Sequence, residues 1–94
     1  MSWMEQRKKR FEKINSELKK MYKTEICCNQ ETFINGEGRF RIFEFTGENA
    51  LCLEYAESEN EARLNLFEDG DRFYLDEYPD EEKMLQAMIE EIKQ

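Results

Sequence analysis

The side chains of this 94-residue chain that could carry chemistry are three cysteines and twenty-two carboxylates, and the sequence contains no histidine. The lack of histidine removes the usual general acid–base, the Ser-His-Asp and Cys-His triads and the commonest metal ligand. Cys27, Cys28 and Cys52 have neither the spacing nor the fourth ligand of a structural zinc site. We interpret them as reduced thiols, with the adjacent pair on opposite faces of one strand. A redox role for an exposed thiol is the alternative.

The carboxylates and the glycines show no catalytic pattern. Asp69-Gly70-Asp71 lacks the frame and the distal glutamate of a calcium loop, and Gly36-Glu37-Gly38 lacks the pattern of a phosphate loop. Hairpin turns explain both segments better. Most of the other acids fall at turns, at polar strand positions or at a helix start, where a solvated surface accounts for them. The sequence therefore predicts a protein that is not an enzyme and that holds no metal or cofactor.

Charge is divided by position along the chain. Residues 1–24 carry eight Lys or Arg and three Glu, whereas residues 25–94 carry six Lys or Arg and nineteen Asp or Glu. A basic first segment is thus joined to a strongly acidic body, and the whole chain has a net charge of −8. An acidic body attracts a cationic partner and repels a polyanion. The charge pattern therefore favours a protein partner with a basic surface.

Periodicity predicts the elements that position these side chains. Ser2 and Glu5 form a capping box, and apolar residues then recur at helical spacing at Met4, Phe11, Ile14, Leu18 and Met21. A last helix follows Asp80, with its apolar stripe at Met84, Leu85, Met88, Ile89 and Ile92. Between these helices the period is two, which predicts strands at residues 24–34, 39–46, 50–56, 61–68 and 71–78. Asn35-Gly36 and Asp69-Gly70 are expected to form turns between strands.

These elements predict a single α+β domain over residues 1–94. We expect a two-layer sandwich in which an N-terminal and a C-terminal helix cover one face of an antiparallel meander of four to five strands (α-β-β-β-β-β-α). The element order is similar to that of frataxin-like domains, small secretion chaperones and some bacterial immunity proteins. The basic first helix departs from the acidic first helix typical of frataxins. The sequence shows neither a membrane-spanning apolar run nor a signal peptide, which favours a cytoplasmic location without a membrane partner.

The leading functional hypothesis is a small acidic protein-binding module, of the inhibitor or immunity type, that occupies a cationic surface of another protein. Its expected contact residues form three acidic clusters. They are Glu57, Glu59 and Glu61; Glu68, Asp69 and Asp71; and Glu77, Asp80, Glu81 and Glu82.

The alternative hypothesis is a homodimer or complex subunit that associates through an aromatic sheet face. The strand at residues 39–45 carries apolar residues on both sides, so either a bulge shifts its phase or its second face is partly covered. The expected interface residues are Phe43, Phe45, Phe67 and Tyr74. A weaker alternative is nucleic-acid contact through the basic first helix, which the isoelectric point of about 4.6 disfavours.

Overall fold

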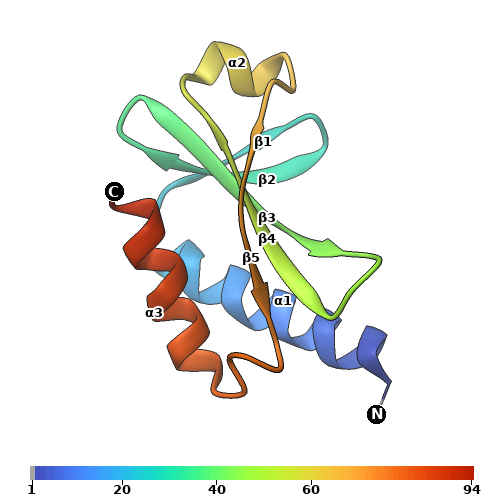
Figure 1. Ribbon diagram of the computed structural model, residues 1–94. Coiled ribbons are helices and arrows are strands. Elements are labelled where there is room, and N and C mark those ends of the chain that lie inside the picture. The colour runs from blue at the N-terminus through green and yellow to red at the C-terminus, as the bar shows by residue number, and fades with distance from the viewer. Residues whose placement is uncertain (1) are drawn as a thin grey trace.

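The computed structural model describes residues 2–94 and has the predicted α+β architecture, with a helix at each end of a five-stranded antiparallel meander (Figure 1). Hydrogen-bonded neighbours follow the order β1-β2-β3-β4-β5, so every strand pairs with the next one in sequence. The elements are α1 (Trp3–Met21), β1 (Thr24–Cys27), β2 (Gln30–Asn35), β3 (Gly38–Phe45), β4 (Ala50–Ala56), α2 (Glu59–Arg63), β5 (Glu68–Tyr74) and α3 (Glu81–Ile92).

Both predicted helix caps are present. The Ser2 hydroxyl accepts a hydrogen bond from the Glu5 N–H at 3.2 Å, and the Asp80 carboxylate accepts one from the Glu82 N–H at 2.9 Å. Each cap satisfies a backbone donor that the first turn of a helix leaves free. No helix within residues 2–94 is both long and apolar enough to cross a membrane.

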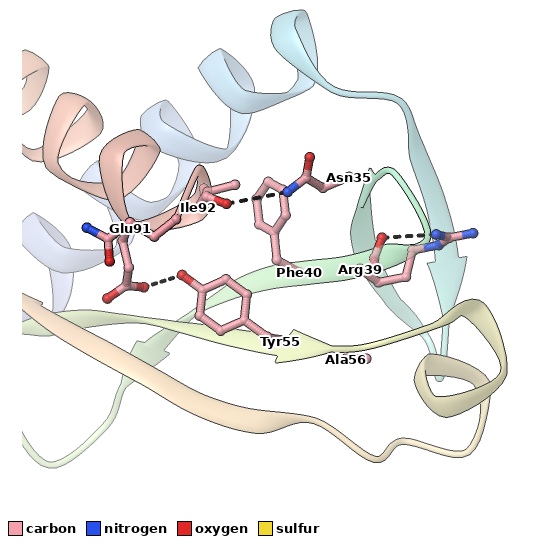
Figure 2. A pocket seen from close by; sticks show the side chains of 9 residues that line it. Asn35, Arg39, Phe40, Tyr55, Ala56, Glu91 and Ile92 are labelled. Atoms are coloured by element: carbon pink, nitrogen blue, oxygen red, sulfur yellow. Dashed lines mark hydrogen bonds between the residues drawn. The ribbon is translucent and has the colours of Figure 1, made fainter.

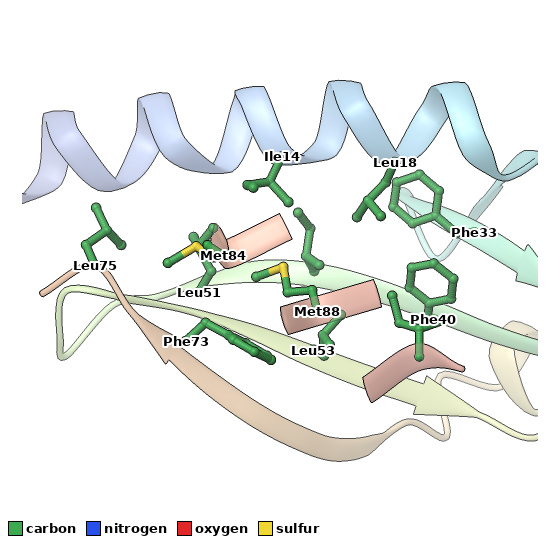
Figure 3. Close-up of a cluster of buried hydrophobic side chains, with 12 residues drawn as sticks. Ile14, Leu18, Phe33, Phe40, Leu51, Leu53, Phe73, Leu75, Met84 and Met88 are labelled. Atoms are coloured by element: carbon green, nitrogen blue, oxygen red, sulfur yellow. The ribbon is translucent and has the colours of Figure 1, made fainter. Parts of the chain in front are cut away.

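The hydrophobic core lies between the sheet and the two long helices (Figure 3). Ile14 and Leu18 of α1 are fully buried there, as are Met84 and Met88 of α3. The antiparallel register of β3 and β4 places Ile42 opposite Leu53, so inward residues of the two strands meet on one face. We call this face the core face of the sheet, and the opposite face the second face. At the ends of the predicted α1 stripe, Met4 and Met21 are instead 69% and 50% exposed.

The first predicted strand, residues 24–34, is wrong in one respect, because it is a hairpin. β1 and β2 are joined by Cys28-Asn29, whose φ angles of 55° and 64° are those of a type I′ turn. Cys28 is therefore an exposed turn residue rather than the strand neighbour of the buried Cys27. The turn contains no glycine, so the usual sequence signal for it is missing.

The fourth predicted strand, residues 61–68, is also wrong. Its first three residues belong to the short helix α2, which Ser58 caps by accepting a hydrogen bond from the Glu61 N–H at 3.2 Å. A strand here would point Ala62, Leu64 and Leu66 inward, but only Ala62 is buried, and Leu64 and Leu66 are 62% and 56% exposed. The predicted turn at Asp69-Gly70 lies inside β5, beside an irregularity in the pairing of β4 and β5.

Candidate functional site

Every arginine of the chain forms an ion pair within the protein. Two of them belong to the basic first segment, and their side chains are only 8% and 12% exposed. Arg7 pairs with Glu44 at 3.2 Å and donates hydrogen bonds to the backbone carbonyls of Phe45 and Glu48 at 3.0 and 2.7 Å. Arg7 thereby joins α1 to the turn between β3 and β4.

Arg10 joins α1 to the segment before α3. Its guanidinium donates to the carbonyls of Tyr78 and Pro79 at 2.7 and 3.1 Å and lies 3.9 Å from the Glu81 carboxylate. The expected basic face of α1 therefore consists of lysines, because the side chains of these two arginines are largely buried.

The second face of the sheet is partly covered, as one of the two alternatives for the strand at residues 39–45 required. The register of β3 and β4 runs unbroken from Arg39 to Phe45, so no bulge shifts its phase. Instead, α2 and the loop after it cover one part of this face, where Cys27, Ala56 and Ala62 form a small buried cluster with Phe67 packed against it.

Arg41 of β3 contacts the residues that cover this face. Its guanidinium carbon lies 3.8 Å from the centroid of the Phe67 ring, a cation–π contact. Its Nε donates to Glu54 at 2.9 Å and its Nη2 donates to Asn65 at 3.1 Å. Phe67 is therefore a residue of the cover rather than of an open aromatic face.

The uncovered part of the second face contains the other three predicted aromatic residues, Phe43, Phe45 and Tyr74, all half-buried. Phe45 and Tyr74 both pair across strands with Ala50, which places them in one row. The Arg72 guanidinium carbon lies 4.1 Å above the Phe45 ring, and a hollow of about 150 Å³ opens beside Phe43, Phe45 and Arg72. The structure therefore divides the predicted aromatic interface into an open part and a covered part.

The ten acidic residues predicted as contacts lie at two ends of the molecule. Glu77, Asp80, Glu81 and Glu82 surround the start of α3, where Asp80 is the cap and Glu81 pairs with Arg10. The other six lie in or next to α2 and in the first part of β5; they are Glu57, Glu59, Glu61, Glu68, Asp69 and Asp71. Figure 1 shows α2 at its top, with β5 running down from that end. The structure therefore brings members of the first two predicted clusters together, namely Glu57, Glu61 and Glu68, and leaves the third cluster apart.

Three acids of the α2–β5 end line one hollow, which we call the acidic hollow. Glu57, Glu61 and Glu68 surround it together with Tyr55, Leu66 and Phe67, and its volume is about 360 Å³. Glu59 lies outside this lining and pairs with Arg63 at 2.6 Å. The sequence suggested the acids but not the apolar side chains between them, because that grouping depends on α2.

A second hollow of about 290 Å³ lies at the C-terminal end of α3 (Figure 2). Inside it the Tyr55 hydroxyl donates a hydrogen bond to Glu91, and the Asp71 N–H donates to the other oxygen of the same carboxylate at 3.2 Å. Burial raises the pKa of Tyr55 and of Glu91, and the neighbouring Asp71 carboxylate raises the Glu91 pKa further.

Glu91 links the end of α3 to the edge strand β5. Glu91 lies in the last turn of α3, where the negative end of the helix dipole disfavours a carboxylate. This unfavourable position was a signal of a specific role that sequence reasoning missed. Both oxygens of this carboxylate already accept hydrogen bonds from the chain. We therefore assign Glu91 a structural role.

The cysteines show no paired or metal-binding arrangement. Cys27 and Cys52 are buried, and burial raises the pKa of both thiols. The exposed Cys28 thiol lies 3.6 Å from the carbonyl oxygens of Ala62 and Arg63. In the part of the chain that the structure describes, no three His, Cys, Asp or Glu side chains are grouped to hold a metal ion.

The acidic hollow combines apolar contact area with carboxylates. This combination suits recognition of a cationic group better than catalysis of a covalent reaction. Comparison of the chain with protein-family models, with curated protein sequences and with solved structures found no match.

Proposed function

We propose that the chain is a small, non-enzymatic protein-binding module that occupies a cationic surface of a partner protein, as inhibitors and immunity proteins do. The observation that supports this function is that the arginines are paired within the chain, whereas several carboxylates are not. All six arginines pair with carboxylates of the chain, four of them with side chains at most 12% exposed. The carboxylates of Glu57, Glu68 and Asp69 have no such partner in the described residues.

Unpaired surface carboxylates set the field that an approaching protein meets. Two unit charges 4 Å apart interact by about 1 kcal/mol in bulk water and by about 4 kcal/mol near a protein surface. Such fields accelerate encounter with a basic partner and disfavour an acidic one. The chain has a net charge of −8, and two of its unpaired acids, Glu57 and Glu68, line one open hollow.

The test is partner capture at two ionic strengths. The tagged chain is incubated with extract of its own source cells at about 0.1 M and about 1 M salt, where the Debye length falls from about 10 Å to about 3 Å. Captured proteins are identified, purified and measured for direct binding. We expect a basic partner that is retained at low salt and released at high salt.

Two variants that change charge in different places sharpen this experiment. Replacing Glu57, Glu68, Asp69, Glu77 and Glu82 by their amides removes acids at both ends and should weaken capture of that partner. Lys8→Gln with Lys9→Gln changes the charge of α1 instead and should leave capture intact. Capture that is indifferent both to salt and to the acidic variant would contradict the proposal.

The second candidate function is that of a homodimer or complex subunit. It is supported by the open part of the second face, where Phe43, Phe45 and Tyr74 are half-buried without a covering element. Nucleic-acid contact through α1 ranks below both candidates. Arg7 and Arg10 are committed to the interior, so phosphate contacts would depend on lysines alone.

A further inference from the structure

We propose that the acidic hollow receives an arginine side chain of the partner protein. This inference rests on the proposed function and goes beyond it by naming the place of contact and the chemistry of the group that enters. Three features of the hollow carry it: an apolar floor held in place, carboxylates that lack partners, and a volume suited to one long side chain.

Tyr55, Leu66 and Phe67 form the apolar part of the lining, which we call the floor, and a backbone hydrogen bond fixes Leu66. Leu66 is 56% exposed, yet its N–H donates to the Glu61 carbonyl at 2.9 Å, so its position is set by α2. Asn65, with φ of 59°, turns the chain just before it. Tyr55 and Phe67 are half-buried beside Leu66. A partner that covers this floor gains burial of apolar surface without having to order a loop.

One face of the Phe67 ring already holds a guanidinium, that of Arg41 at 3.8 Å. This contact keeps the ring in place, and Glu54 balances the charge of Arg41 at 2.9 Å. Phe67 and Tyr55 also line the hollow, and a guanidinium is a cation that aromatic rings attract.

Charge complementarity selects a cationic occupant. The carboxylates of Glu57 and Glu68 have no ion pair or hydrogen bond within residues 2–94, and one oxygen of Glu61 accepts from the Glu57 N–H at 3.1 Å. The arginines of this end are engaged elsewhere, Arg39 with Glu25 at 2.7 Å and Arg63 with Glu59 at 2.6 Å. Three carboxylates thus share the hollow without a cation, and a cation from a partner removes their mutual repulsion.

Arginine fits these conditions better than lysine. A guanidinium is planar, binds carboxylates with two parallel hydrogen bonds, stacks on aromatic rings and is less strongly hydrated than an ammonium. The volume of about 360 Å³ is near the lower limit of pockets that take small molecules, which run from about 300 to 1,000 Å³. One long side chain with its neighbouring backbone therefore suits the hollow better than a large cofactor does.

The test is an NMR titration of the full-length, ¹⁵N-labelled chain with three capped amino acids. The probes are N-acetyl-arginine methylamide, its lysine counterpart and its uncharged citrulline counterpart. We expect saturable shifts at residues 55–68 with the arginine probe, binding by the lysine probe that is about threefold weaker or more, and none by citrulline.

Matched variants locate the binding. Glu57→Gln with Glu68→Gln should weaken arginine binding about fivefold or more, because two ion pairs are lost. Glu77→Gln with Glu82→Gln removes the same charge at the start of α3 and should change it less than about twofold. Leu66→Ala, at an exposed position, should also weaken binding if the floor takes part. Dispersed spectra of every variant confirm that it is folded.

Two results would overturn the inference. Arginine shifts that survive Glu57→Gln with Glu68→Gln unchanged, or that are centred on residues 77–82, place the cation outside the acidic hollow. In that case the proposed function still stands if partner capture remains sensitive to salt. Loss of salt sensitivity in the capture experiment rejects the proposed function itself, whatever the probes show.

Discussion

Arg7 illustrates how a single side chain changes the interpretation of the charge pattern. In the sequence it belongs to a basic cluster that any solvated helix face would explain. In the structure it continues the buried stripe of Phe11, Ile14 and Leu18 toward the N-terminus, at helical spacing. Its long aliphatic stem allows a cation to occupy such a position. Its three acceptors lie 37 to 41 residues away, so no local pattern could have identified them.

We predict that Arg7→Ala lowers the free energy of unfolding by about 2–3 kcal/mol, because it leaves two carbonyls and Glu44 without their donor. This loss is smaller than that for breaking a fully buried ion pair, because the Glu44 side chain is 30% exposed. Lys8→Ala is the control, since the neighbouring residue is exposed and should change stability by no more than about 0.5 kcal/mol. Urea unfolding of both variants measures the difference. Equal losses for the two variants would contradict the role assigned to Arg7.

The acidic hollow shows which parts of a site can be predicted from sequence. Glu57, Glu61 and Glu68 were expected to contact a partner because acids in turns remain solvated. The apolar members Leu66 and Phe67 were assigned to a strand, so their grouping with these acids was not predicted. That grouping depends on α2, and the exposure of Leu66 follows from the turn at Asn65.

At the scale of elements, the sequence predicts α1, α3 and the central strands because each has a local signal. Caps and apolar stripes define the two helices, and alternation defines β4. β3 carries apolar residues on both sides, but it directly follows the turn signal at Asn35-Gly36. The hairpin of β1 and β2 was missed because its turn has no glycine. The helix α2 was missed because Ala62, Leu64 and Leu66 alternate like a strand, although Ser58 and Glu61 have the S-x-x-E spacing of a helix start and Ser58 caps the helix. For a helix of only five residues, the N-cap was therefore a more reliable signal than the spacing of the apolar residues.

The bulged pairing of β4 and β5 depends on Gly70. A Cβ at this position would lie 2.6 Å from Tyr55 Cε2 and 3.0 Å from the Leu53 carbonyl oxygen. We predict that Gly70→Ala lowers the free energy of unfolding by about 1–3 kcal/mol, because the backbone carbonyl cannot move aside and the Tyr55 ring must. The same substitution should displace the Tyr55 hydroxyl from Glu91.

Gly47→Ala is the matched control for this prediction. The added Cβ would meet only Phe45 Cε1, at an ordinary 3.6 Å, so little change in stability is expected. Denaturant unfolding gives the two free energies, and hydrogen exchange at the Asp71 N–H reports whether its bond to Glu91 has opened. Unchanged stability and exchange in Gly70→Ala would show that the strand pairing does not require a glycine there.

At the scale of the whole molecule, the basic and acidic side chains are not divided in space as they are divided along the sequence. The first segment sends two arginines into the interior, and its lysines remain on α1. The acids collect at the start of α3 and around α2 and the first part of β5; α2 and the start of α3 lie far apart in Figure 1. The two leading candidate functions use different parts of this surface. Cationic recognition uses the α2–β5 end, and self-association uses the open part of the second face.

Ionic strength separates these two candidates, because it affects them in opposite directions. Binding of a cationic partner weakens as salt screens the attraction. Two chains that each carry a charge of −8 repel each other, so an aromatic contact between them strengthens when salt screens that repulsion. We predict that self-association through Phe43, Phe45 and Tyr74 increases between about 0.1 M and about 1 M salt, as measured by sedimentation equilibrium.

Phe43→Ser should abolish this association, whereas Leu64→Ser, at a leucine that is 62% exposed but lies outside the aromatic row, should not. Circular dichroism of both variants verifies that they are folded. A chain that stays monomeric at both salt concentrations would contradict the homodimer candidate. A dimer that weakens with salt would instead indicate pairing of the lysines of α1 with an acidic end of a second copy, because only attraction between opposite charges is lost on screening.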